Sequence, residues 1–227
     1  MTAYALQRRT LAGAALLLLV AAVVFVADQM VRTLGTLTAV ERERDTWQRP
    51  EEIIGSLDLR PGQTVVDLGS GAGYFALKMA PLVAPTGRVL AVDLRRQSLA
   101  FLWIRARQGG LANLAVIHGE PDNPRLPPGP VDAALIANTY HELTAPDRIL
   151  KVLFTSMRPG ARLVVVDRGP RASTESRSEA TAHHELTATA ARDEITRHGF
   201  LTEFTDERFI DRAADEDIWW LMVFRKP

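Results

Sequence analysis

The sequence has no cysteine among its 227 residues. That absence excludes a disulfide-built fold, a thiolate zinc site and a cysteine nucleophile. The chain also lacks an excess of charge of either sign, because 27 Lys and Arg residues balance 27 Asp and Glu residues. A neutral balance disfavours a polyanion-binding surface, so we expect no nucleic-acid partner. With 47% apolar residues, the composition is that of an ordinary globular chain.

The N-terminal segment differs from the rest of the chain. An uncharged run of 18 residues extends from Thr10 to Ala27. As a helix it would span roughly 27 Å, close to the thickness of a bilayer's hydrocarbon core. We therefore predict a membrane anchor with one transmembrane helix in residues 1–31.

Two other interpretations of this segment stay open, a cleaved secretory signal and a twin-arginine signal built on Arg8 and Arg9. The apolar run is longer than the usual signal core of about 7 to 15 residues, and it lacks a good small-x-small cleavage site, which favours a retained anchor. Its orientation is undecided, because arginines flank it on both sides. Those on the N-terminal side are Arg8 and Arg9, and those beyond it are Arg32, Arg42, Arg44 and Arg49.

Residues 32–50 are charged and predict a connector that ends in a short helix, with Trp47 packed on the domain that follows, residues 51–227. In that domain apolar β-rich runs alternate with amphipathic stretches. This alternation predicts an α/β fold with a mostly parallel sheet covered on both faces. The expected strands are residues 64–68, 88–93, 114–117, 131–137 and 162–167, and the expected helices are residues 74–83, 97–108 and 146–157. Arg95, Arg96, Arg105 and Arg107 are expected to form a solvated basic face.

The end of the chain predicts a hairpin. A helix over residues 184–198 is stopped by Gly199, and two strand-like runs follow, residues 200–209 and 218–224. A polar connector, residues 210–217, joins them, and a hairpin here makes one strand antiparallel. A loop is expected over residues 169–178.

The sharpest motif is a glycine-rich loop. A buried strand runs into Gly69, Gly71 and Gly73, and a helix follows. Glycines let a ligand approach the backbone, and the following helix presents free N–H groups, which together make a nucleotide-shaped pocket. About 20 residues later Asp93 ends the next strand, where its carboxylate can accept hydrogen bonds from two ribose hydroxyls.

The spacing of these glycines disfavours a dinucleotide. The dinucleotide pattern G-x-G-x-x-G has its third glycine one residue later, where this chain has Tyr74. Asp67, two residues before the first glycine, would lie unfavourably beside a pyrophosphate and suits a cationic ligand better, such as an amine or a sulfonium. An NAD-dependent oxidoreductase is thereby disfavoured.

Four blocks in a fixed order carry a family resemblance: Asp67–Gly73, Val89–Asp93, Val131–Asn138 and the turn Arg158–Leu163. In them the chain resembles the class I S-adenosylmethionine-dependent methyltransferases, whose loop reads (D/E)-x-G-x-G-x-G and whose turn reads K-P-G-G-x-L. The resemblance covers residues 51–227. It implies a Rossmann-like seven-stranded sheet with an antiparallel last strand, in agreement with the hairpin, and S-adenosylmethionine as cofactor.

The resemblance also implies the cofactor contacts. The three glycines would line the methionine part, with Asp67 near its amino group, and Asp93 would hold the ribose hydroxyls. Leu94 would lie near the adenine, whose amine would meet Glu120 or Asp122. The full set of predicted cofactor-binding residues is Asp67, Gly69, Ser70, Gly71, Gly73, Tyr74, Asp93, Leu94, Glu120 and Asn138.

The acceptor end is expected after the fourth strand, at Asn138, Thr139 and Tyr140. An acceptor that carries a proton needs a base, and His141 has the ordinary pKa best suited to that role. We predict His141 and Tyr140 as catalytic residues.

The run His183-His184-Glu185 suggests a metal site. However, adjacent histidines point in different directions on a helix, and there is no His-x-x-x-His pair. The sequence therefore predicts no metal.

The expected function is methyl transfer to a small-molecule acceptor that the sequence does not identify. The chain lacks the Asn/Asp-Pro-Pro-Tyr/Phe run of amide- and base-directed enzymes and the thiols of an arsenite-type enzyme. The anchor favours a lipophilic acceptor such as a quinone or a lipid precursor. We expect the catalytic domain to lie in the cytoplasm, where the cofactor is accessible, although an exported domain stays open. The alternative is a non-catalytic module of the same fold that binds the cofactor or acts as a scaffold at the membrane.

Overall fold

The computed structural model describes residues 2–170, 183–212 and 217–227. The chain divides into two compact units, Met1–Thr46 and Trp47–Pro227. The described residues of the N-terminal unit belong to one helix, α1 (Thr2–Trp47), which includes most of the predicted connector 32–50. The part Leu16–Trp47 contains an apolar window long enough to be a candidate membrane span, a property that a signal sequence shares.

The second unit begins with a short helix, α2 (Pro50–Gly55). Pro50 opens this helix, because its fixed φ and missing N–H suit the first helical turn. Arg49 donates a 2.7 Å hydrogen bond to Glu52, and this bond lowers the pKa of the Glu52 carboxyl. Trp47 packs against the ring of Trp219, with 5.7 Å between the ring centroids, which confirms its predicted position.

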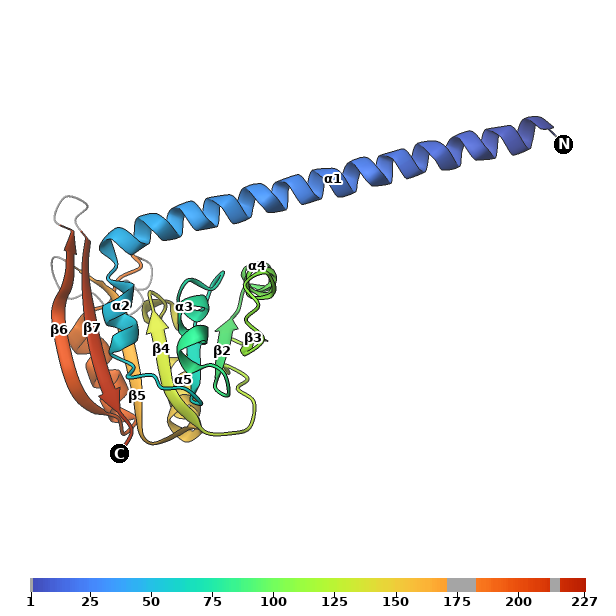
Figure 1. Cartoon of the computed structure of the whole chain (residues 1–227). Coiled ribbons are helices and arrows are strands. Elements are labelled where there is room, and N and C mark those ends of the chain that lie inside the picture. Colours follow the sequence, from blue (N-terminus) through green and yellow to red (C-terminus); the bar gives the residue numbers. More distant parts are fainter. Residues whose placement is uncertain (1, 171–182, 213–216) are drawn as a thin grey trace. The chain divides into compact units, whose positions relative to one another are not determined.

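The centre of the second unit is a seven-stranded sheet of order β3-β2-β1-β4-β5-β7-β6 (Figure 1). The strands are β1 (Thr64–Leu68), β2 (Arg88–Asp93), β3 (Leu114–His118), β4 (Val131–Ala137), β5 (Met157–Gly169), β6 (Leu201–Arg212) and β7 (Asp217–Arg225). The first five are parallel, and β7 is antiparallel to both β5 and β6. The predicted mostly parallel sheet with an antiparallel hairpin is confirmed.

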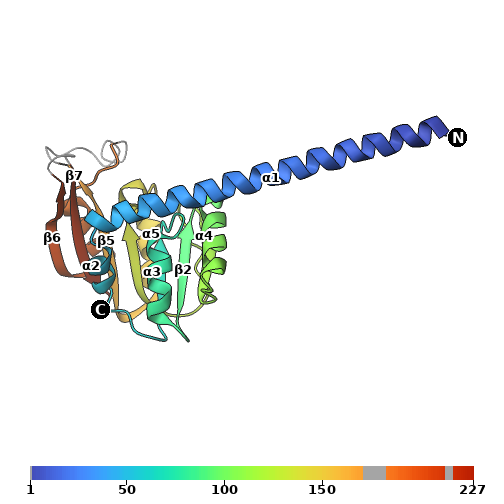
Figure 2. The ribbon, with the colours of Figure 1, turned by 45° about the horizontal axis from the view of Figure 1, so that its top comes forward.

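Helices cover both faces of the sheet (Figure 2). On one face α2, α3 (Tyr74–Val83) and α4 (Arg96–Gln108) enclose a core that includes Val65, Met79 and Leu102. On the other, α5 (Pro146–Ser156) and α7 (Ala188–Arg197) enclose a core that includes Val66 and Trp220. Because successive side chains of a strand point to opposite faces, a buried parallel strand supplies both cores and is apolar along most of its length.

The predicted boundaries are wrong in three parts of the chain. The last helix begins at Ala188 instead of residue 184, because the Leu186 N–H donates to the carbonyl of Arg168 at the end of β5, and Thr187 then caps the helix. β5 begins at Met157, within the predicted helix, and it extends past residue 167 to Gly169. β6 and β7 take in both ends of the predicted connector 210–217, whose residues 213–216 lie outside the described chain, as do residues 171–178 of the predicted loop.

A substitution of Trp220 tests how the fold holds the segment before α7. The Trp220 ring is buried, and its Nε1–H donates a 2.6 Å hydrogen bond to the carbonyl of Leu186. Trp220→Phe removes this donor and leaves a buried carbonyl unpaired, so we expect the free energy of unfolding to fall by about 1–3 kcal/mol. Denaturant unfolding of the full chain in detergent measures the change.

Trp103, which is 52% exposed, provides the matched control. We expect Trp103→Phe to change the free energy of unfolding by no more than about 0.5 kcal/mol. Equal destabilisation by the two substitutions would contradict this account of Trp220.

Candidate functional site

A cleft of about 250 Å³ opens where the parallel strands β1, β2 and β4 end. The strand order reverses between β1 and β4, and ligands bind at such a switch point in open α/β sheets. The lining residues are Leu68, Gly69, Gly71, Val92, Asp93, Leu94, Arg95, Glu120, Pro121, Pro124, Asn138, Thr139, Glu142, Leu143 and Ile149.

The glycine loop needs its glycines for two different reasons. Gly69 has φ +79°, and a Cβ there would lie 2.1 Å from Oγ1 of Thr139. It therefore allows the loop after β1 to approach the segment after β4. Gly71 has φ +54°, and a Cβ there would meet no atom within 4 Å. Gly71 therefore keeps the wall of the cleft open to a ligand.

The loop is held by charged side chains from the neighbouring elements. Asp93 accepts 2.8 Å and 2.7 Å hydrogen bonds from the N–H groups of Gly71 and Arg95. Arg105 donates a 2.7 Å hydrogen bond to the carbonyl of Ala72. The prediction that Arg105 belongs only to a solvated face is wrong, and Arg95 of the same set lines the cleft. The sequence did not predict this support, because Arg105 lies on α4, 33 residues after Ala72.

The cleft brings together six of the predicted cofactor residues: Gly69, Gly71, Asp93, Leu94, Glu120 and Asn138. Glu120 borders the cleft and forms an ion pair with Arg125, whereas Asp122 pairs with Arg148 and is not among the lining residues. Of the two carboxylates considered for the adenine amine, the structure therefore places Glu120 at the cleft.

The other four predicted cofactor residues lie behind the cleft wall. Asp67 and Ser70 are buried at the base of the loop. Gly73 lies at the start of α3, where a Cβ would collide with Leu102 of α4, and Tyr74 packs in the core with 5% of its surface exposed. The positions of Gly73 and Tyr74 follow from the packing of α3 and α4 on the sheet.

These residues fit S-adenosylmethionine in chemistry. Among the described residues, the buried Oγ of Ser70 has no hydrogen-bond partner, so a polar group remains to be satisfied beside the loop. The buried carboxylate of Asp67 suits a cationic amine, and the exposed Leu94 offers an apolar surface to a flat ring. The wall at Gly71 is open to the ligand's approach.

His141 lies on the 3₁₀ turn η1 (Tyr140–Glu142) after β4, only 2% exposed. Its Nδ1 is 2.7 Å from Oδ1 of Asp167, and its backbone N–H donates a 3.0 Å hydrogen bond to Oδ2 of the same carboxylate. Because a carboxylate accepts, we assign the ring proton to Nδ1, which leaves a lone pair on Nε2. Sequence reasoning missed Asp167, although a carboxylate at the end of a buried strand was a usable signal.

Tyr140 does not reach the cleft. Its ring is fully buried in the core on the α5 and α7 side of the sheet, and its hydroxyl donates a 2.9 Å hydrogen bond to Glu194 of α7. His141 is not among the cleft-lining residues either, and its Nε2 lies 3.8 Å from Oε1 of Glu142. The neighbouring Glu142 lines the cleft itself.

Comparisons with known proteins agree with this architecture. A family model described as a methyltransferase domain matches residues 59–210. The ubiquinone/menaquinone biosynthesis C-methyltransferase UbiE of Vibrio campbellii is 28% identical over 109 residues, which cover 48% of this chain and 42% of that protein. The protein of the same name from Pasteurella multocida is 28% identical over 110 residues, 48% of this chain and 41% of its own. The chain spans less than half the length of these relatives.

Solved structures show the same fold. A SAM-dependent methyltransferase from Aquifex aeolicus aligns with a TM-score of 0.69 and 21% identity over 84% of this chain and 97% of that one. The phosphoethanolamine N-methyltransferase 2 of Haemonchus contortus, in complex with S-adenosyl-L-methionine, has a TM-score of 0.61 and 15% identity over 80% of this chain and 53% of that one. The chain therefore belongs to the methyltransferase domain family, and the class I S-adenosylmethionine-dependent methyltransferase fold expected from its glycine loop is confirmed.

Proposed function

We propose that the chain transfers a methyl group from S-adenosylmethionine to a lipophilic, hydroxyl-bearing ring of the quinone class. The observation that carries the proposal is the cleft, in which the glycine loop and Asp93 form one end and the turn η1 forms the other. Two further points support the acceptor class: the relatives are named for quinone biosynthesis, and α1 is apolar along much of its length.

In this proposal one end of the cleft binds the cofactor and the other end binds the acceptor. Asp93 binds the ribose hydroxyls, and Glu120 meets the adenine amine. Gly69 and Gly71 would line the methionine end, with the carboxylate of Asp67 buried behind them, and the sulfonium would face the segment after β4, where Asn138 and Glu142 line the cleft. The bound cofactor supplies an electrophilic methyl group, so the protein mainly orients the acceptor and excludes water.

The acceptor must supply an electron pair to the methyl carbon. That pair forms the new bond, the carbon–sulfur pair stays with sulfur, and the acceptor gives up one proton. In this proposal His141 assists the loss of that proton. Asp167 fixes its ring with the proton on Nδ1, and Nε2 lies 3.8 Å from Oε1 of Glu142, a residue that lines the cleft. Loss of the proton makes the acceptor oxygen more electron-rich. That oxygen and the ring carbons conjugated with it become better nucleophiles, so the step favours methyl transfer to either carbon or oxygen.

A single added methyl tests the cofactor cleft. Gly71→Ala places a Cβ in the open space beside the loop, and we expect the affinity for S-adenosylmethionine to fall by about tenfold or more, equivalent to about 1.4 kcal/mol. Calorimetric titration of the full chain in detergent measures it.

The matched control is Gly160→Ala. Gly160 also has a positive φ, +81°, and open space around its Cβ position, but it is not among the cleft residues. Gly160→Ala also places a side chain at a positive φ, but outside the cleft, so we expect its affinity for the cofactor to equal that of the wild type. Equal weakening by both substitutions would mean that strain, not occupation of the cleft, causes the effect.

A labelled-methyl assay tests the proposed transfer. The full chain in vesicles that contain extracted membrane quinones and their hydroxylated precursors is incubated with methyl-labelled S-adenosylmethionine. We expect label in the organic phase and an equal amount of S-adenosylhomocysteine. His141→Gln should lower kcat by about 100-fold or more with cofactor affinity unchanged.

Two results would count against the proposal in different ways. Cofactor binding without label in any extract would favour the non-catalytic binding module. Label in water-soluble acceptors only would keep methyl transfer and overturn the lipophilic acceptor.

The proposal also places α1 in the membrane as a retained single-pass anchor with residues 51–227 in the cytoplasm, where the cofactor is made. A pair of reporters fused after Pro227, one active only in the cytoplasm and one active only after export, should give the cytoplasmic signal. A signal from the exported reporter would contradict this location. A shortened chain on a gel would instead show that the segment is cleaved.

A further inference from the structure

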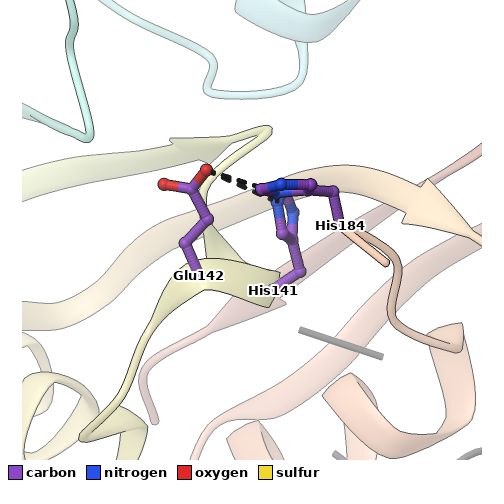
Figure 3. Close-up of side chains that lie close together, drawn as sticks. All are labelled: His141, Glu142 and His184. Carbon is purple, nitrogen blue, oxygen red and sulfur yellow. Dashed lines mark hydrogen bonds and ion pairs between the residues drawn. The ribbon is translucent and has the colours of Figure 1, made fainter. Parts of the chain in front are cut away.

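Three side chains from two distant segments meet beside the cofactor cleft (Figure 3). Nε2 of His141 lies 3.4 Å from Nδ1 of His184 and 3.8 Å from Oε1 of Glu142, and His184 Nδ1 lies 3.6 Å from the same Oε1. We propose that these three residues bind one divalent transition-metal ion, with Zn²⁺ as the best fit.

The spacing of the three donor atoms matches a coordination triangle. The nearest point equidistant from the three atoms lies in their plane, about 2.1 Å from each, which is the length of zinc bonds to histidine nitrogen and carboxylate oxygen. Two histidines and one carboxylate are also a common set of protein ligands for catalytic zinc and for non-haem iron. The side chains therefore need little movement to hold an ion.

Asp167 prepares His141 for this role. It accepts the Nδ1 proton and the backbone N–H of His141, which fixes both the tautomer and the ring orientation. A histidine that ligates a metal is usually supported in this way by a carboxylate on its other nitrogen. Nε2, which carries the lone pair, then faces His184 and Glu142, and Figure 3 shows the three side chains directed toward one another.

The other two ligands are held from outside the core. His184 has a left-handed backbone, with φ +57°, in the segment just before the Leu186 N–H that bonds to β5. Glu142 also forms an ion pair with Arg95, whose guanidinium lies 4.0 Å from Oε2, the other oxygen of this carboxylate. Oε1 is the oxygen directed toward the two imidazoles, and the arginine leaves it available to an ion.

The position of Glu142 gives the ion a place in the chemistry, and this step rests on the proposed function. Glu142 also lines the cofactor cleft, so the ion would lie at the border of that cleft. Three protein ligands leave at least one coordination position for a substrate oxygen. The ion would bind the acceptor hydroxyl and favour release of its proton to solvent, so that His141 acts on the acceptor through the ion.

Metal binding is tested on the full chain, purified in detergent without a histidine tag and stripped with a chelator. Dialysis against Zn²⁺ followed by elemental analysis gives the stoichiometry, and competition with a chromophoric chelator gives the affinity. We expect one zinc per chain. His184→Ala and Glu142→Gln should each weaken binding by about 100-fold or more, and Asp167→Asn by about 10-fold to 100-fold.

His183→Ala is the matched control, because His183 is the adjacent histidine and lies outside the cluster. It should keep wild-type zinc affinity. The side chains of His184 and Glu142 are 63% and 42% exposed, so their substitutions should leave the fold intact, which circular dichroism checks. Absorption bands of bound Co²⁺ that His184→Ala abolishes and His183→Ala preserves would support the same site.

Two outcomes would overturn the metal site: no stoichiometric zinc in the wild type, or unchanged zinc affinity in both His184→Ala and Glu142→Gln. The cluster would then be a hydrogen-bonded pair of imidazoles beside a carboxylate. Methyl transfer that persists after complete removal of metal would refute the ion's role in the reaction and leave the proposed function standing. Zinc binding without any methyl transfer would contradict the proposed function and leave the metal site standing.

Discussion

The buried carboxylate of Asp167 is the interaction on which the acceptor side of the structure depends. It is fully enclosed at the end of β5, and it accepts hydrogen bonds from the backbone and ring of His141 and from the N–H of Arg168. A buried carboxylate is costly unless donors surround it, so this arrangement fixes the turn η1 against β5. The direction of His141, and with it the place of Glu142, follows from that constraint.

The same edge of the sheet organises the cofactor side. Asp93 at the end of β2 holds the glycine loop by the N–H of Gly71, as Asp167 at the end of β5 holds η1. Parallel strands bring their carboxyl ends to one edge of the sheet. Asp93 therefore supports the loop after β1, and Asp167 supports the turn after β4, at the same edge. Glu142 joins those ends, because it lines the cleft and also contributes to the cluster with His141 and His184.

Much of the fold was predictable because its signals are local. The strands β1, β2 and β4 are short apolar runs, and the glycine loop is a contiguous motif, so both follow from adjacent residues. The start of α7 was not predictable from local signals, because a hydrogen bond from Leu186 to β5 competes with helix propensity before Thr187. The limits of β5, β6 and β7 also depend on pairing between strands distant in sequence.

The candidate site divides in the same way. Gly69, Gly71 and Asp93 were found from spacing alone, whereas the pairing of His141 with Asp167 and His184 joins residues 26 and 43 positions apart. The sequence argument against a metal considered His183 and His184 as neighbours on one helix. In the structure His184 lies before that helix and meets a histidine from another segment. Tyr140 does not lie at the predicted site for a similar reason, since its hydroxyl donates a hydrogen bond to Glu194, 54 positions away.

The central claim is that one edge of the sheet holds the cofactor and directs its sulfur toward the turn η1. A crystal structure of the full chain with S-adenosylhomocysteine tests this most directly. The account predicts ribose hydroxyls on Asp93, adenine beside Leu94 and Glu120, and the sulfur on the side of Asn138 and Glu142. A ligand bound away from the glycine loop, or one whose sulfur faces away from Glu142, would contradict it.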